Sequence, residues 1–356
     1  MKRNDQSSIA EARVALVDAV LQRFFSLSKK RAAPLGAHYE HLWGLLERNT
    51  QGGKRFRPRM VMAAYEGLGG DDRDAAAYVG AAFELLHTAL IVHDDVIDRD
   101  FVRRGIPNIS GAYRDHAVDR GVSVEIAEHR GVSAAVIAGD LALFNAYRLI
   151  DKSGVASPVR ERLLDVLDEA MFTSAAGELI DVDFSIDPEM PLVDDILTME
   201  RLKTAVYSFE SPLQAGAILA GAPESTVATL GAFGRDIGIA YQIVDDVLGV
   251  FGEEEATGKT TIGDLREGKR TVMIAFACST PAWARLCELI GKADLSLDEA
   301  SEARLLLIEC GARAFAEDLA RGYANRALAR LAEPHIPSAL RDELHPVAET
   351  VLKRVR

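Results

Sequence analysis

The sequence has few cysteines, and their positions exclude two common uses. Cys278, Cys287 and Cys310 are the three cysteines in 356 residues. They match neither a zinc-binding spacing nor the framework of a disulfide-rich domain, and they lie far from any histidine pair. We therefore expect reduced thiols and a cytoplasmic protein.

Positive charge and long apolar runs are also lacking. The chain has 41 basic and 54 acidic residues, which gives a net charge of -13. This balance argues against a nucleic-acid partner, which normally requires a basic face. There is no run of about 18 apolar residues, and the N-terminus lacks the apolar centre of a signal peptide. We expect no transmembrane segment.

Signals for β-strands are scarce. We find no convincing period-two alternation and no Asn-Gly or Asp-Gly hairpin turn. Helical periodicity dominates, and no linker separates segments of different composition. We therefore predict one all-α domain over residues 1–356, a helical bundle around a central cavity. The expected helices span about 8–28, 36–49, 55–68, 72–98, 133–150, 158–181, 194–220, 224–250, 270–279, 299–331 and 338–354.

An apolar helix that ends in carboxylates, residues 84–98, organises the predicted bundle. Asp94, Asp95 and Asp98 follow its apolar positions and lie within about one turn of each other. Such carboxylates repel each other unless they are solvated, paired with cations or neutralised by a metal ion. Hard oxygen ligands favour Mg²⁺, which takes one or two carboxylates and completes its shell with water and substrate phosphates.

A second segment, residues 238–249, repeats this design. It is an apolar helical run that closes on Asp245 and Asp246. Two such helices facing each other would hold metal ions between them. This arrangement suits a substrate that carries a diphosphate group.

Basic residues cluster in three places that fit a diphosphate. In residues 51–58 a glycine pair precedes Lys54 and Arg57 at the start of a predicted helix, where anions bind readily, although solvated surface charge is an alternative. Arg103 and Arg104 follow the first acidic segment, and arginine suits bidentate phosphate contact. Residues 252–271 form a glycine-spaced loop that could close over a ligand. Its spacing excludes a Walker phosphate loop.

Residues 111–133 are polar and charge-rich, with two histidines, His116 and His129. These histidines lack the paired spacing of metal sites. We therefore interpret the stretch as a solvated loop or a short helix.

In combination these segments resemble the trans-isoprenyl diphosphate synthases (polyprenyl synthetases), particularly actinobacterial geranylgeranyl diphosphate synthases. The resemblance implies an all-α isoprenoid synthase fold and a homodimer. It also implies Mg²⁺-dependent condensation of isopentenyl diphosphate with an allylic diphosphate. The motifs occur in the family's order over residues 52–271: Gly-Gly-Lys-x-x-Arg-Pro (52–58), Leu-Leu-His (85–87), Asp-Asp-x-x-Asp (94–98), Arg-Arg-Gly (103–105), Gly-Asp (139–140), Lys-Thr-Ala (203–205), Gln-x-x-Asp-Asp (242–246) and the loop motif 258–271.

The resemblance assigns roles to matching positions. Asp94, Asp98 and Asp245 would bind Mg²⁺, with three ions per active site, and Asp95 would support them. These four carboxylates and Lys203 would form the catalytic group. The residues that would hold the allylic diphosphate are Arg103, Lys203, Thr204, Gln242, Lys259 and Lys269, and those that would hold isopentenyl diphosphate are Lys54, Arg57, His87 and Arg104.

The resemblance also implies that residues before Asp94 limit the product's length. Ala89 is too small to stop a growing chain, so the floor of the apolar tunnel would lie deeper, at Leu85, Leu86 or Phe83. Phe144, on a following helix, is another bulky candidate. We therefore predict geranylgeranyl diphosphate as the product, with farnesyl or longer products as alternatives.

One position departs from the family pattern. The second acidic motif usually ends in a third aspartate, and here that residue is Gly249. A catalytically inactive subunit of a heteromeric synthase is therefore an alternative, although such subunits usually lose aspartates from the first motif. A class I terpene cyclase is a further alternative, but it would not need the isopentenyl diphosphate site.

Overall fold

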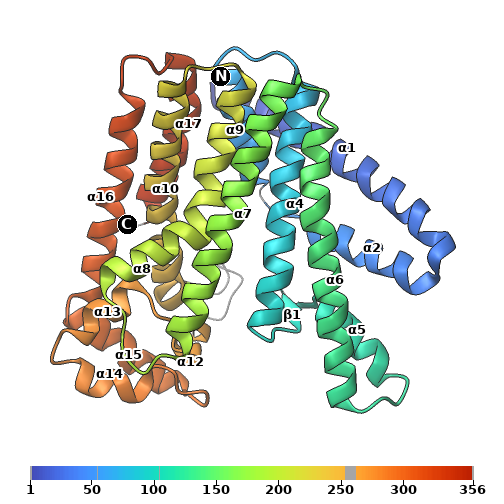
Figure 1. Cartoon of the computed structure of the whole chain (residues 1–356). Helices are drawn as coiled ribbons and strands as arrows, with labels where there is room; N and C mark the ends of the chain where they lie inside the picture. Colours follow the sequence, from blue (N-terminus) through green and yellow to red (C-terminus); the bar gives the residue numbers. More distant parts are fainter. Residues whose placement is uncertain (1, 54, 104, 253–261, 355–356) are drawn as a thin grey trace. The chain divides into compact units, whose positions relative to one another are not determined.

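The computed structural model describes residues 2–53, 55–103, 105–252 and 262–354, which are helical almost throughout (Figure 1). This confirms the predicted all-α class. The elements are α1 (Lys2–Ala32), η1 (Ala33–Leu35), α2 (Ala37–Thr50), α3 (Phe56–Gly67), α4 (Arg73–Ile97), β1 (Val102–Arg103), β2 (Ile106–Pro107), α5 (Ile109–Val118), α6 (Val124–Asp151), α7 (Ser157–Ile186), α8 (Val193–Glu200), η2 (Arg201–Glu210), α9 (Ser211–Leu219), α10 (Glu224–Phe251), α12 (Gly263–Glu267), α13 (Val272–Cys278), α14 (Trp283–Leu289), α15 (Leu297–Glu309), α16 (Ala312–Leu331) and α17 (Ser338–Arg354).

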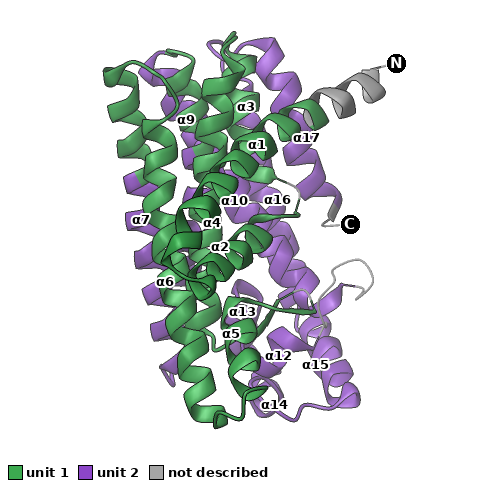
Figure 2. Ribbon diagram, turned by 90° about the vertical axis from the view of Figure 1, so that its right-hand side faces the viewer, with its two compact units in different colours: residues 1–167, 212–222 green, residues 168–211, 223–356 purple. Residues whose placement is uncertain are grey.

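The chain divides into two compact units (Figure 2). Unit 1 contains residues 1–167 and 212–222, and unit 2 contains residues 168–211 and 223–356. Each unit has its own buried apolar side chains. The single domain expected over residues 1–356 stays a prediction.

The core of unit 1 forms where α4 packs against α6. The α4 side contributes bulky residues, and Phe83, Leu85 and Leu86 are fully buried. The α6 side contributes small residues at spacings of three and four, which lie on one helical face. An ideal Cβ at Gly139 would lie 2.2 Å from His93 Nε2, so the two helices are in close contact there. The small residues thereby fix the acidic end of α4 against α6. They include Ala135, Ala138, Ala142 and Ala146, whereas Gly131, on the same face of α6, packs against α5.

The core of unit 2 forms around α10, which packs against α16 and η2. The segment η2 is a ten-residue π-helix, a rare conformation that is often found at functional sites. Ideal Cβ atoms at Gly234 and Gly238 would lie 2.7 Å from Glu210 Cα and 2.6 Å from Ala205 Cβ. Glycine at these positions lets η2 lie directly on α10. The predicted site residues Lys203 and Thr204 belong to η2.

Several sequence predictions differ from the structure. The helix expected over 299–331 is wrong as a single helix, because Gly311 adopts φ +82 between α15 and α16. The helix expected over 133–150 begins earlier, at Val124, and α5 precedes it, so the polar stretch 111–133 is largely helical. No strand was expected, yet β1 and β2 pair antiparallel, with Val102 opposite Pro107. That short hairpin contains Gly105 at φ +75 and none of the usual turn dipeptides.

Two helices, α4 and α6, are long and apolar enough to cross a membrane by length and composition. The apolar window of α4 is 78% buried and that of α6 is 44% buried. A core helix of a globular protein passes the same test, so this finding is weak evidence for a membrane span.

Close packing of α5 on α6 gives a test of the fold. An ideal Cβ at Gly131 would lie 2.3 Å from the backbone oxygen of Ser110. Gly131→Ala should therefore force α5 away from α6 and lower the free energy of unfolding by about 1–3 kcal/mol. Denaturant unfolding followed by circular dichroism measures this change.

Gly44→Ala is the matched control, because no atom lies within 4 Å of an ideal Cβ at this position inside α2. Alanine there should raise the free energy of unfolding by about 1 kcal/mol, the usual gain over glycine in a helix. Equal effects of the two substitutions would contradict the close packing of α5 on α6.

Candidate active site

The basic segment 52–58, which the sequence predicts to bind phosphate, is anchored by a buried arginine. The Arg55 side chain is 7% exposed. Its Nε donates to Asp18 Oδ1 at 2.8 Å, and its Nη1 donates to Glu84 Oε1 at 2.8 Å and to the carbonyl oxygen of Thr50. Arg55 adopts the left-handed conformation, with φ 49, immediately before α3. These bonds hold the strained turn at Arg55 against α4. Glu84, which accepts one of the bonds, lies about one helical turn before His87.

The first acidic motif lies at the C-terminal end of α4 and is paired with Arg103. Asp95 Oδ1 accepts from Arg103 Nε at 2.7 Å, and Asp94 Oδ2 accepts from Arg103 Nη2 at 3.1 Å. Asp95 is buried, and this burial raises the pKa of its carboxyl group more than the bonds from Arg103 lower it. Asp94 is half-buried, and Asp98 is exposed at the C-cap. The three carboxylates therefore differ in environment, which the shared helical face did not predict.

The second acidic motif lies near the C-terminal end of α10 and is paired with Lys269. Asp246 Oδ1 accepts from Gln242 Nε2 at 3.0 Å and from Lys269 Nζ at 2.8 Å. Burial alone would lower the pKa of the Lys269 ammonium, but Asp246, Asp264 and Asp245 together raise it. Asp245 is half-buried and forms no hydrogen bond or ion pair with the described residues apart from this electrostatic interaction.

Lys203 on η2 is paired with two carboxylates of α7. Its Nζ lies 2.6 Å from Asp181 Oδ2 and 3.1 Å from Glu178 Oε2. An ideal Cβ at Gly177 would lie 2.2 Å from the backbone nitrogen of Lys203, so α7 and η2 are in close contact. The sequence analysis missed both carboxylates. Their three-residue spacing on a predicted helix was a signal that could have identified them.

A buried acid, Glu200, lies beside the second motif at the junction of α8 and η2. It is 2% exposed, and neither carboxyl oxygen has a hydrogen-bond partner among the described residues. Burial, and then the neighbouring Asp246, raise the pKa of Glu200 well above its usual value. A buried carboxylate beside another carboxylate is costly, so the neutral acid is favoured. Nothing in the local sequence distinguishes Glu200 from a surface glutamate.

The predicted tunnel residues on α4 are buried, but Phe144 is not. Ala89 is 1% exposed, and Leu85 and Leu86 are fully buried. Phe144 is 63% exposed on α6, so it closes no cavity within this chain. Its predicted role in setting product length stays a prediction that requires another surface to cover it.

The remaining predicted site residues are distributed as follows. Arg57, His87 and Thr204 are half-buried, on α3, α4 and η2 respectively. Lys54, Arg104 and Lys259 lie outside the described residues.

The described residues contain no group of three or more histidine, cysteine or acidic side chains already arranged to hold a metal ion. The carboxylates of both acidic motifs are nevertheless hard oxygen donors. Mg²⁺ usually takes only one or two of these from a protein and obtains its other ligands from water and substrate phosphates. The donor chemistry therefore fits Mg²⁺.

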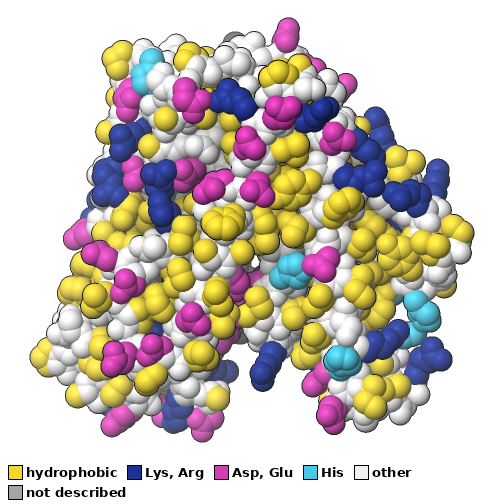
Figure 3. Space-filling view, viewed as in Figure 1, with side chains coloured by type: hydrophobic (Ala, Val, Ile, Leu, Met, Phe, Trp, Pro, Cys, Tyr) yellow, Lys and Arg dark blue, Asp and Glu magenta, His cyan; other side chains and the backbone are white. Residues whose placement is uncertain are grey.

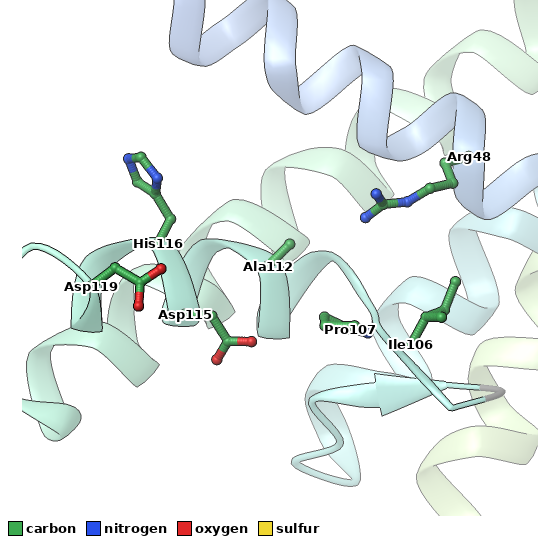
Figure 4. Close-up of a pocket in the computed structure, with 7 residues that line it drawn as sticks. All are labelled: Arg48, Ile106, Pro107, Ala112, Asp115, His116 and Asp119. Carbon is green, nitrogen blue, oxygen red and sulfur yellow. The ribbon is translucent and has the colours of Figure 1, made fainter.

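A surface cavity of about 510 Å³ lies elsewhere in unit 1 (Figure 4). Its wall includes Arg48 of α2, Ile106 and Pro107 of β2, and Asp115, His116 and Asp119 of α5. None of the predicted site residues lines it. We assign it no role in catalysis.

The family model for polyprenyl synthetases matches residues 40–306. The chain belongs to the polyprenyl synthetase family. It is therefore a trans-prenyltransferase with the isoprenoid synthase fold, as the sequence motifs predict.

Similar proteins support this assignment along the whole chain. A geranylfarnesyl diphosphate synthase of Aeropyrum pernix is 31% identical over 346 residues, 96% of this chain and 100% of that protein. A (2E,6E)-farnesyl diphosphate synthase of Mycobacterium tuberculosis is 33% identical over 316 residues, 86% of this chain and 81% of that protein. The crystal structure of a Corynebacterium glutamicum geranylgeranyl pyrophosphate synthase, complexed with isoprenyl diphosphate and magnesium, superposes with a TM-score of 0.88 at 29% identity and covers 96% of this chain and 98% of that one.

The buried acid of this synthase gives a prediction about pH. The pKa of Glu200 is raised on folding, so the folded protein retains a proton that the unfolded chain loses above its ordinary value of 4.5. Between pH 4.5 and the raised pKa, the proton held by Glu200 in the folded state should lower the free energy of unfolding of the wild type by about 1.4 kcal/mol for each pH unit of increase. Glu200→Gln removes this dependence, so the variant should gain stability relative to the wild type as the pH rises.

Denaturant unfolding of both proteins from pH 5 upward measures the difference. Glu309→Gln, at an exposed glutamate of α15, is the matched control and should follow the wild type at every pH. A constant difference between the wild type and Glu200→Gln across the range would show that Glu200 is ionised in the folded protein.

Proposed function

We propose that this synthase is a Mg²⁺-dependent enzyme that condenses isopentenyl diphosphate with an allylic diphosphate to make geranylgeranyl diphosphate. One observation carries the proposal. The described cations that the family pattern assigns to the allylic diphosphate, Arg103, Lys203 and Lys269, are each held by carboxylates. A cation beside a carboxylate can bind a metal–diphosphate complex by exchanging its partner for a phosphate oxygen.

The metal would be held by Asp94 and Asp98 of the first motif and by Asp245 of the second, with Asp95 in support. We propose that both motifs bind Mg²⁺, with three ions per active site. Asp245, half-buried and without a hydrogen bond to the described residues, is available as a ligand. When bound, Mg²⁺ would supply charge neutralisation for the departing diphosphate.

The reaction begins with cleavage of the allylic carbon–oxygen bond, which leaves negative charge on the diphosphate. Arg103, Lys203 and Lys269 would stabilise that charge, with Thr204 and Gln242 as further donors. The alkene of isopentenyl diphosphate then attacks the allylic cation and forms the new carbon–carbon bond. Loss of a proton restores the double bond, and we assign that proton to the released diphosphate.

Isopentenyl diphosphate would bind at the segment that Arg55 anchors. Arg57 and His87 come from α3 and α4, which both belong to unit 1. The bond from Arg55 to Glu84 joins the start of α3 to α4 close to His87. This bond supports a shared binding site, to which Lys54 and Arg104 would also contribute.

The product assignment rests on the apolar face of α4. Ala89 is small and buried near the first motif, and the bulkier Leu85 and Leu86, which are also buried, precede it by about one turn. The similar proteins named above make farnesyl, geranylgeranyl and geranylfarnesyl diphosphates, so family membership alone does not choose among them. A floor one turn below Ala89 supports the geranylgeranyl product.

A homodimer is supported by two apolar stripes. In unit 2, Phe172, Leu179 and Ile186 are exposed at seven-residue intervals along α7. In unit 1, Ile137 and Phe144 are exposed with the same spacing on α6. Hydrophobic side chains are exposed over much of the surface that the space-filling view shows (Figure 3). Seven-residue repeats suit helix–helix pairing, and we propose that a second copy covers these stripes, including Phe144, in the cytoplasm.

The purified protein should be incubated with Mg²⁺, isopentenyl diphosphate and, separately, dimethylallyl, geranyl and farnesyl diphosphates. Mass spectrometry then measures the products. We expect geranylgeranyl diphosphate from each primer. Products of another length would contradict the placement of the floor, and no product from any primer would contradict the proposed function.

Asp94→Asn and Asp98→Asn test the first motif. Each variant removes one carboxylate charge at nearly constant volume, so kcat should fall by at least about 100-fold while the melting temperature stays close to that of the wild type. Asp71→Asn, at an exposed loop acid of unit 1, is the control and should retain wild-type kcat. Wild-type turnover by Asp94→Asn or Asp98→Asn would rule out their assigned role.

Ala89→Phe tests the tunnel. A phenyl ring at this buried position should block chain growth and shift the product to farnesyl diphosphate or shorter, whereas Leu86→Ala should lengthen it. The same assay with mass spectrometry measures both changes. Ala316→Phe, at a fully buried alanine of unit 2, controls for general overpacking and should leave product length unchanged. An unchanged product from both α4 variants would place the floor elsewhere.

A further inference from the structure

Gly249 occupies the position where the second acidic motif usually has a third aspartate. It lies four residues after Asp245 on α10, so the two positions share a helical face. The space beside Gly249 is filled by another acid. An ideal Cβ at position 249 would lie 2.0 Å from Asp264 Oδ2 and 2.9 Å from its Cγ. The Asp264 carboxylate therefore occupies the volume that a side chain at position 249 would need.

The backbone at Asp264 is held by the turn that follows it. It lies in the first turn of the short helix α12, which Gly268 ends with φ 69. The chain then turns back, and the Lys269 backbone nitrogen donates to the Asp264 carbonyl oxygen at 3.0 Å. The Lys269 ammonium interacts with Asp264, Asp245 and Asp246. Asp264 thus belongs to the same charged group as the second motif.

We propose that Asp264 supplies the third carboxylate of the second acidic motif, in place of the side chain that Gly249 lacks. The inference rests on the proposed function, in which this motif binds a metal–diphosphate complex. It explains how the synthase would keep its activity with glycine at position 249, because α12 supplies the missing carboxylate. It also means that restoring the usual aspartate at position 249 alone harms the site, since that side chain would displace Asp264 and add repulsion.

The test measures binding of inorganic diphosphate in the presence of Mg²⁺ by titration calorimetry, using the full chain, together with kcat and KM for prenyl transfer. Asp264→Asn and Gly249→Asp should each weaken diphosphate binding by about tenfold or more, roughly the effect of 1.4 kcal/mol. The double variant Gly249→Asp/Asp264→Ala moves the carboxylate back to α10. It should bind more tightly than either single variant.

A second pair of variants separates the effect of moving the Asp264 carboxylate from the effect of adding a charge at position 249. Gly249→Ala adds only a methyl group, which should weaken binding by moving the Asp264 carboxylate. In an Asp264→Ala background the same substitution should have no further effect, because the displaced group is absent. Asp298→Asn, at an exposed acid of α15, is the matched control and should bind as the wild type does. Melting curves without Mg²⁺ identify any variant that fails to fold.

Additive losses in the double variants, or wild-type binding by Asp264→Asn, would overturn the inference. Its failure is distinguishable from that of the proposed function. If the wild type catalyses prenyl transfer and Asp264→Asn binds diphosphate as the wild type does, only the role of Asp264 is refuted. If the variants show the predicted pattern of diphosphate binding but the wild type catalyses no prenyl transfer, only the proposed condensation reaction is refuted.

Discussion

Pairing between carboxylates and cations is the interaction on which the site depends. Arg103 joins Asp94 and Asp95, Lys203 joins two carboxylates of α7, and Lys269 joins Asp246. Without these cations the acids within each motif would repel each other, because they lie next to one another near the end of an apolar helix. The same pairs keep the cations in place before a ligand arrives. In the proposed function a metal–diphosphate complex, which carries both signs of charge, would replace each partner without leaving a buried charge uncompensated.

Close helix packing holds these charged groups in position. In unit 1 the small residues of α6 let α4 approach, and the contact of Gly139 with His93 lies beside the first motif. In unit 2, Gly177 and Gly238 bring α7 and α10 onto η2, which carries Lys203. Larger side chains at these positions would separate the helices. Packing and catalysis therefore constrain the same helices.

The sequence predicts the helical class and the motif-bearing residues, because helical periodicity and clustered acids are local signals. It does not predict the interactions between segments. Asp95 is paired with Arg103 from β1, and Arg55 is paired with Asp18 and Glu84. Glu200 and Asp264 acquire their environments from α10, which belongs to a different segment of the chain from either residue. The break at Gly311 was missed because apolar periodicity continues on both sides of a single left-handed residue.

The proposed function requires both acidic motifs to bind metal ions together with diphosphate. The most direct measurement is a crystal structure of the protein with inorganic diphosphate and Mn²⁺ in place of Mg²⁺, with the metal ions located by anomalous diffraction. We predict ions bound by Asp94 and Asp98 of the first motif and by Asp245 of the second, with diphosphate bound at the ions. Ions bound by only one motif, or a diphosphate held away from both, would contradict this prediction.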